Sequence, residues 1–256
     1  MIWMEQENFP AAFVERIKRL LPENEWDAFF ELCTESLPKV VRKGDKDLVL
    51  KDDWNLTETA IEGSFFVDRA EGTVPLGKTL EHFTGGVYAQ SLSSMLPVLV
   101  LDPQPGEKIL DMCSAPGSKS TFMAQRMENV GSLICNEMSS SRCKKLVANL
   151  NRLGVCNSVV TQSDGCRMSS FFDQEFDHIL LDAPCSSEGF ARRDAKFFSQ
   201  MWAERKIFEA SKLQRQLICS AFEMLRPGGG MVYSTCTSAP EENELVVKHL
   251  IDTYGD

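Results

Sequence analysis

Along residues 88–251, short apolar runs alternate with longer stretches in which apolar residues recur at helical spacing. The apolar runs are rich in Val, Ile and Leu, as are strands buried on both faces of a sheet. They predict strands over 108–113, 132–137, 158–161, 177–182 and 231–234. The longer stretches predict helices over 88–101, 121–127, 139–153, 197–225 and 241–251. Strands that alternate with helices predict an α/β fold, in which a parallel sheet carries helices on both faces.

The first 78 residues follow a different pattern. Apolar positions over residues 10–36 predict two short helices. After them, brief apolar runs at 48–50 and 64–67 lie between charged turns, which indicates small strands or loops. We therefore expect a small α+β adaptor domain over residues 1–78 and a larger α/β domain over residues 79–256.

Composition excludes several classes of protein. The chain has 256 residues, 43% apolar and 25% charged, as soluble globular proteins do. It contains no apolar run long enough to span a membrane and no N-terminal secretory signal, so we expect a cytoplasmic protein without a membrane partner. A formal net charge of −10 is unlike that of a general nucleic-acid coat protein, although it leaves room for a local basic groove.

Nine cysteines occur without a single C-x-x-C pair, and the three histidines are isolated. The usual zinc and thioredoxin patterns are therefore missing, and no metal site is predicted. In a reducing compartment we expect most of these cysteines to be small buried hydrophobic residues.

Acidic residues follow four successive predicted strands, at Asp111, Glu137, Asp164 and Asp182. Parallel sheets bind ligands outside the carboxyl ends of their strands, and a carboxylate after the second strand suits a ribose diol. Acidic residues also cap helices at such positions, but four in register favour a ligand site. The loop after the first strand, Cys113–Lys119, consists mostly of small residues that let backbone approach a ligand.

Two features of the sequence indicate which class of ligand this site binds: a fingerprint that is missing and a glycine-rich run that is present. The loop lacks the G-x-G-x-x-G fingerprint of nicotinamide-dependent dehydrogenases, which disfavours that class. The run Leu-Arg-Pro-Gly-Gly over residues 225–229 resembles the segment before a late strand in methyltransferases that use S-adenosylmethionine.

Two cysteines follow the last two predicted strands, Cys185 in Asp-Ala-Pro-Cys and Cys236 in Ser-Thr-Cys-Thr. C5 of cytosine is a poor nucleophile, and addition of a thiolate at C6 makes it reactive enough to accept a methyl group. Asp182 is placed to act as the acid that stabilises charge at N3 of the base, provided that it is protonated or shares a proton. Packing is the alternative role for each cysteine, and their shared polar context disfavours it.

Three runs closely resemble those of the Sun-type (nucleolar protein/Sun domain) RNA cytosine-C5 methyltransferases: 110–121, 182–189 and 233–237. Further matches lie in 81–97 and 149–154, and the resemblance covers residues 75–251. Within the family, the chain looks most like the bacterial enzymes that form 5-methylcytosine in small-subunit (16S) ribosomal RNA. The resemblance implies a Rossmann-like class I methyltransferase fold, S-adenosyl-L-methionine as the cofactor and RNA as the partner.

The resemblance also implies roles for individual residues. Cys236 would be the nucleophile and Cys185 would help release the methylated RNA, with Asp182 and Lys119 beside them. DNA cytosine methyltransferases attack with a Pro-Cys thiol instead, so chemistry alone leaves the two roles open. Cofactor contacts are implied for Cys113, Ser114, Ala115, Pro116, Gly117, Ser118, Lys119, Glu137, Asp164 and Asp182.

Some features depart from the family pattern. Val40–Asp45 stands where relatives carry an Arg-x-Asn-Thr run, and we expect the C-terminal RNA-binding domain of the bacterial enzymes to be absent. Basic stretches at 142–155 and 192–215 are candidates for phosphate contacts, or else solvated faces with ion pairs. We expect a monomer that does not bind DNA. A tRNA substrate, or a catalytically quiet ribosome assembly factor, remains the alternative.

Overall fold

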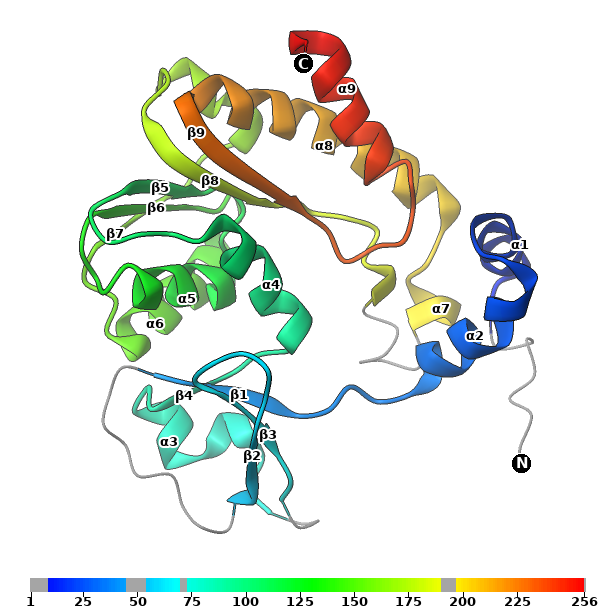
Figure 1. Ribbon diagram of the computed structural model, residues 1–256, viewed down its shortest axis with the longest axis horizontal. Coiled ribbons are helices and arrows are strands. Elements are labelled where there is room, and N and C mark those ends of the chain that lie inside the picture. Colours follow the sequence, from blue (N-terminus) through cyan, green and yellow to red (C-terminus); the bar gives the residue numbers. More distant parts are fainter. Residues whose placement is uncertain (1–8, 45–53, 70–72, 190–196, 256) are drawn as a thin grey trace. The chain divides into compact units, whose positions relative to one another are not determined.

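The computed structural model describes residues 9–44, 54–69, 73–189 and 197–255 (Figure 1). The chain divides into two compact units. One, here the sheet unit, comprises residues 38–182 and 217–234. The other, the helical unit, comprises residues 1–37, 183–216 and 235–256. The predicted division into an adaptor domain over residues 1–78 and a larger domain over residues 79–256 stays a prediction.

A five-stranded sheet forms the centre of the sheet unit, in the order β7-β6-β5-β8-β9. All four neighbouring pairs are parallel, which confirms the predicted sheet. The strands are β5 (Lys108–Asp111), β6 (Ser132–Asn136), β7 (Ser158–Thr161), β8 (Phe176–Asp182) and β9 (Leu225–Ser234). The central strand β5 is the first in sequence, so the strands that follow it lie on both sides of it and their carboxyl ends share one edge.

Helices complete the α/β architecture. Figure 1 shows α4 (Leu92–Leu101), α5 (Ser118–Arg126) and α6 (Ser140–Leu153) together on one face of the sheet. Apolar side chains from these helices and from the strands form one buried core, with members such as Met95, Ile109, Met123, Leu133, Leu146 and Leu180. The short 3₁₀ helix η5 (Gly165–Ser170) follows β7. Burial of β5, β6 and most of β8 explains their continuous apolar runs, whereas β7 and β9 are half-buried or exposed.

A second, antiparallel sheet in the same unit has the order β2-β3-β1-β4. Its strands are β1 (Val40–Lys43), β2 (Leu56–Glu58), β3 (Ser64–Val67) and β4 (Val87–Ala89), and η4 (Leu76–Lys78) and α3 (Leu80–Phe83) lie between β3 and β4. The apolar run at 64–67 is therefore a strand, as expected, and the run at 48–50 lies outside the described residues.

The prediction of a helix from residue 88 is wrong at its start. Tyr88 lies in β4 and pairs with Arg42 of β1, and α4 begins only at Leu92. Pairing with a distant strand overrides the local pattern here. The guanidinium of Arg42 is buried and donates to Gln90 and Thr121 at 3.3 and 2.9 Å, and also to Gln125. Arg42 therefore ties the small sheet to α5.

The helical unit gathers three separate chain segments. It contains α1 (Ala11–Leu20), η2 (Glu23–Glu25), α2 (Trp26–Thr34), α7 (Phe197–Gln200), residues 204–216 of α8 (Glu204–Met224) and α9 (Glu244–Tyr254). The two predicted N-terminal helices are confirmed. The single helix predicted over 197–225 is instead two helices, α7 and α8. Aromatic side chains dominate the core of this unit: Phe9, Phe13, Phe30, Phe197 and Phe198, with Ile17.

Candidate functional site

Asp111 ends β5 at the carboxyl edge of the parallel sheet, with only 1% of its surface exposed. Its Oδ2 accepts a hydrogen bond from Ser120 Oγ at 2.6 Å, whereas its buried Oδ1 has no hydrogen-bond partner within the described residues. Burial raises the pKa of Asp111 to about 6; the Ser120 hydrogen bond opposes this rise, and the nearby Asp182 carboxylate adds to it. An acceptor atom left unsatisfied in this way suits a ligand that brings a donor.

The loop 113–119 is fixed by hydrogen bonds at both ends. Ser114 donates through its Oγ to the carbonyl of Asp111 at 2.7 Å. Arg142 and Asn149 of α6 donate to the carbonyls of residues 115 and 116 at 2.6 and 2.8 Å. Gly117, at φ +102°, precedes α5, and a Cβ there would also lie 3.1 Å from a side-chain atom of α6. The loop therefore presents α5 with its free N–H groups at the sheet edge.

Glu137 follows β6 and is also buried, with 4% exposed. Its Oε1 accepts from the backbone N–H of Ser139 at 2.8 Å. Its Oε2 lies 3.1 Å from Arg142 Nη1 in an ion pair whose geometry falls short of a hydrogen bond. Glu137 can therefore still accept hydrogen bonds from a hydroxyl pair.

Asn136 and Asp164 organise the neighbouring strand ends. The Asn136 amide donates to the carbonyls of Met112 and Ser163 at 3.2 and 3.0 Å, which ties the segments after β5 and β7 together. Asp164 caps η5 by accepting from the N–H of Cys166 at 3.0 Å. Burial raises the pKa of the Cys113 thiol above its ordinary range, so this cysteine stays protonated and is no nucleophile.

Asp182 ends β8 and accepts from two side chains. Lys119 Nζ donates to its Oδ2 at 2.6 Å, and Ser234 Oγ donates to its Oδ1 at 2.8 Å. Lys119 is largely buried and comes from the first turn of α5. The structure therefore forms an ammonium–carboxylate pair from two residues that the sequence had placed in one site.

The donor and acceptor set at this edge fits S-adenosylmethionine. The ammonium and ribose hydroxyls of that molecule are hydrogen-bond donors, and the buried acceptors Asp111 Oδ1 and Glu137 Oε2 are the complementary groups. Within the described part of the chain, no cluster of three or more His, Cys, Asp or Glu side chains is arranged to hold a metal ion.

The two thiols lie together in the helical unit. The sulfur atoms of Cys185 and Cys236 are 3.0 Å apart, and the N–H of Cys236 donates to Cys185 Sγ at 3.4 Å. Cys236 is exposed and Cys185 is half-buried. The hydrogen bond with Cys236, together with burial, raises the pKa of Cys185 above its ordinary range. Cys185 therefore stays a thiol and can donate toward the sulfur of Cys236.

The cysteine-bearing loops are joined directly beside the sulfurs. The N–H of Gly189 donates to the carbonyl of Cys236 at 2.7 Å, and Ser186 Oγ donates to Thr237 Oγ1 at 3.0 Å. A Cβ at Gly189 would lie 3.1 Å from the same carbonyl, so a glycine permits this close approach.

Sequence reasoning missed several residues of these sites. Asp111 belongs to the acidic series but was absent from the predicted cofactor contacts, and Asn136 and Arg142 were not predicted at all. Asn136 stands directly before Glu137, and Arg142 follows it by little more than one helical turn. Glu188 and Glu242, which contact both cysteine-bearing loops, were also missed because their partners are distant in sequence.

The chain is similar to several known proteins. The family model described as 16S rRNA methyltransferase RsmB/F matches residues 98–256. The chain is 39% identical to ribosomal RNA small subunit methyltransferase F of Vibrio parahaemolyticus and 40% identical to that of Klebsiella pneumoniae, over 96% of its length in each case. It covers 54% of each relative, so the chain spans about half the length of the curated relatives it matches.

A solved structure described as a methyltransferase homologue from Pyrococcus horikoshii is also similar. It is 29% identical, with a TM-score of 0.75, over 96% of this chain and 83% of that one. The class I methyltransferase fold expected from the sequence is thus confirmed. No helix in the described segments combines the length and apolar character needed to cross a bilayer.

Proposed function

Because the chain belongs to the 16S rRNA methyltransferase RsmB/F family, we propose that it methylates C5 of a cytosine in small-subunit ribosomal RNA. The observation that carries the proposal is the thiol pair, with sulfurs 3.0 Å apart and unequal environments. The curated relatives bear the name ribosomal RNA small subunit methyltransferase F, which supports the choice of RNA. The proposal includes the expectation of a cytoplasmic monomer that does not bind DNA.

S-adenosylmethionine supplies an activated methyl group when bound. In the proposal, Glu137 accepts from its ribose hydroxyls, and Asp111 accepts from its amino group through the open Oδ1. The loop 113–119 approaches with its backbone, Asp164 lies at the neighbouring strand end, and Lys119 and Asp182 complete the edge. The ion pair with Arg142 keeps the Glu137 carboxylate in place.

Cys236 is the proposed nucleophile, because its sulfur is exposed and adjoins a thiol that keeps its proton. The thiolate forms a bond to C6, and the electron pair of the C5–C6 double bond becomes available at C5 for the methyl group. The C5 proton then passes to solvent water, its electron pair re-forms the C5–C6 double bond, and the C6–S bond breaks. Cys185 donates its S–H to the departing sulfur, which is the proposed release role.

Asp182 and Lys119 supply the acid of the proposal. Addition at C6 places negative charge on the N3 side of the base, where a proton donor lowers the barrier. Lys119 Nζ donates a hydrogen bond to Asp182 Oδ2 at 2.6 Å, which supports the proposal that the two residues act together.

Exposed basic residues on α8 are proposed to contact RNA phosphates: Arg205, Lys206, Lys212 and Arg215. The remaining basic residues of that predicted stretch, Arg192, Arg193 and Lys196, lie outside the described residues. The other stretch, 142–155, is partly engaged internally, because Arg142 pairs with Glu137 and Arg152 donates to the carbonyl of Val87.

The test is transfer of a labelled methyl group from S-adenosylmethionine to unmodified 16S rRNA and to tRNA, analysed as nucleosides. 5-Methylcytidine in 16S rRNA alone is the expected result. 5-Methylcytidine in tRNA alone would mean that tRNA, and not ribosomal RNA, is the substrate. No product on either RNA, with cofactor binding intact, would favour the quiet assembly factor over an enzyme.

A further inference from the structure

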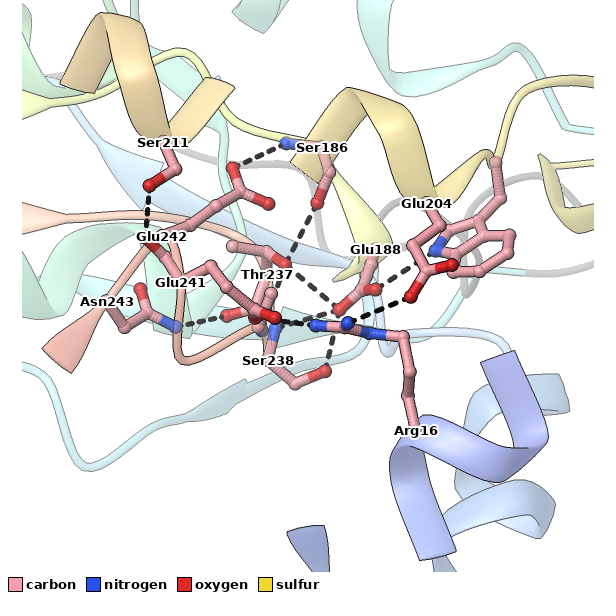
Figure 2. Close-up of polar contacts among 12 residues, drawn as sticks. Arg16, Ser186, Glu188, Glu204, Ser211, Thr237, Ser238, Glu241, Glu242 and Asn243 are labelled. Carbon is pink, nitrogen blue, oxygen red and sulfur yellow. Dashed lines mark hydrogen bonds and ion pairs between the residues drawn. The ribbon is translucent and has the colours of Figure 1, made fainter. Parts of the chain in front are cut away.

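Glu188 stands three residues after Cys185 and is buried, with 8% of its surface exposed. Its carboxylate accepts four hydrogen bonds (Figure 2). Trp202 Nε1 donates to Oε1 at 3.0 Å. Thr237 Oγ1, Ser238 N and Ser238 Oγ donate to Oε2 at 2.9, 3.0 and 2.7 Å. A carboxylate from the Cys185 loop thus accepts hydrogen bonds from the two residues directly after Cys236.

Glu242 makes the reverse connection. It stands six residues after Cys236 and is fully buried, with 0% exposed. Its Oε2 accepts from the N–H of Ser186, the residue directly after Cys185, at 2.9 Å. Gln214 of α8 donates to the same oxygen at 2.9 Å and to the carbonyl of Pro184 at 2.9 Å. Each cysteine-bearing loop is therefore held by a carboxylate from the other.

We propose that Glu188 and Glu242 are positioning residues, a reciprocal carboxylate pair that fixes the distance between the sulfurs of Cys185 and Cys236. The inference rests on the proposed function for its catalytic consequence. Glu188 accepts from the two residues after Cys236, and Glu242 accepts from the residue after Cys185, so both act through the neighbours of the cysteines. Burying a carboxylate is costly unless several donors compensate for lost water, and Glu188 has four.

The donors facing Glu188 require hydrogen-bond acceptors at both of its oxygens. Oε1 faces the indole N–H of Trp202 and Oε2 faces the backbone N–H of Ser238, and neither group can accept a hydrogen bond. A glutamine at 188 must place its NH₂ against one of these donors. In Glu188→Gln, the new NH₂ group therefore faces another hydrogen-bond donor, while the side-chain volume is nearly unchanged. We expect this repulsion to push the two loops apart without leaving a cavity.

The first measurement needs neither RNA nor cofactor. Iodoacetamide alkylation of each cysteine is followed by peptide mass spectrometry from neutral pH to about pH 10, with exposed Cys156 as the internal reference. In the unmodified protein, Cys185 reacts at higher pH than Cys156, because its thiol is buried against Cys236. In Glu188→Gln we expect the Cys185 profile to move down by about one pH unit or more.

The second measurement is single-turnover methyl transfer to 16S rRNA. A displacement of about 1 Å at a reacting atom costs about 10²-fold in rate, so we expect a loss of that size in Glu188→Gln with cofactor affinity unchanged. Failure of the proposed function would appear as no transfer by the unmodified protein, and the alkylation profile would still report on the carboxylate pair.

Two further variants separate positioning from general stability. Glu244→Gln changes an exposed carboxylate on α9 and should leave both readouts unchanged. Trp202→Phe removes the indole N–H, so the double variant with Glu188→Gln can place its NH₂ where that donor was. The Cys185 profile should then return toward that of the unmodified protein. An unshifted profile in folded Glu188→Gln, or a double variant no closer to the unmodified protein, would overturn the proposal.

Discussion

Asp111 and Glu137 of the sheet unit differ from Glu188 of the helical unit in how their buried carboxylates are hydrogen-bonded. In the sheet unit, Asp111 and Glu137 each keep one buried oxygen without a hydrogen bond from the described residues. In the helical unit, Glu188 receives four donors from its own unit. A buried acceptor without a partner costs about 1–3 kcal/mol, so the open oxygens of Asp111 and Glu137 suit a ligand that brings donors, and the four donors to Glu188 suit a positioning role.

The largest expected effect is a loss of methyl transfer when a cysteine of the helical unit is replaced. Cys236→Ala removes the proposed nucleophile, and we expect methyl transfer to fall by at least about 10³-fold. Cofactor affinity, measured by calorimetry, should stay within about twofold because the predicted cofactor contacts lie in the sheet unit. Cys156→Ala, at an exposed cysteine of the sheet unit, is the matched control. Full activity of Cys236→Ala would assign the attack to another group.

The next largest expected effect is a loss of cofactor affinity when a buried carboxylate of the sheet unit is replaced. Glu137→Gln replaces the open Oε2 or its partner oxygen by a donor, and we expect cofactor affinity to fall by about 10- to 100-fold. The alkylation profiles of Cys185 and Cys236 should not change. Glu128→Gln, at an exposed glutamate of the same unit, serves as control. Unchanged cofactor affinity in Glu137→Gln would remove this residue from the cofactor site.

A stability difference should follow from the open oxygen of Asp111. Burial raises its pKa from 3.8 to about 6, so the unfolded chain loses this proton at lower pH than the folded one. Stability is therefore lost as pH rises from about 4 to 6, by up to about 3 kcal/mol. We expect Asp111→Asn to be more stable than the unmodified protein at pH 7, by about 2 kcal/mol, and to match it below about pH 4.

Denaturant unfolding at both pH values measures this difference, with exposed Asp173→Asn as the control. The same variant should bind S-adenosylmethionine more weakly. Equal stability of Asp111→Asn and the unmodified protein at pH 7 would mean that another group stabilises the buried Asp111 carboxylate. The contrast between Asp111 and Glu188 would then be wrong.

The smallest effect concerns ion pairs within the helical unit. Arg16 of α1 donates to Glu241 and Glu204 at 2.6 and 3.3 Å (Figure 2). Both glutamates are partly exposed, so we expect Arg16→Ala to cost no more than about 1 kcal/mol, and less in high salt. Thermal unfolding at two salt concentrations measures it. A loss well above that limit would place Arg16 among the groups that position the cysteine-bearing loops.

The sequence predicted the parallel sheet because its inner strands β5, β6 and β8 are mostly buried and their apolar runs are local. It also singled out Glu137, Asp182 and the two cysteines, since each directly follows a strand or belongs to a family motif, and their roles stay predictions. It missed β4 because Tyr88 is a strand residue only through pairing with Arg42. It missed Glu188 and Glu242 for the same reason, since the donors that link them to the other cysteine-bearing loop, Thr237 and Ser186, are distant in sequence.

The most direct test of the account is the covalent step itself. Cys185→Ala is incubated with 16S rRNA and S-adenosylmethionine, the RNA is digested, and the protein is mapped by mass spectrometry. The account predicts that a nucleotide adduct accumulates on Cys236, because the thiol that assists its departure is missing. Rapid turnover by Cys185→Ala without an adduct, or an adduct on any other residue, would contradict the assignment of nucleophile and release group.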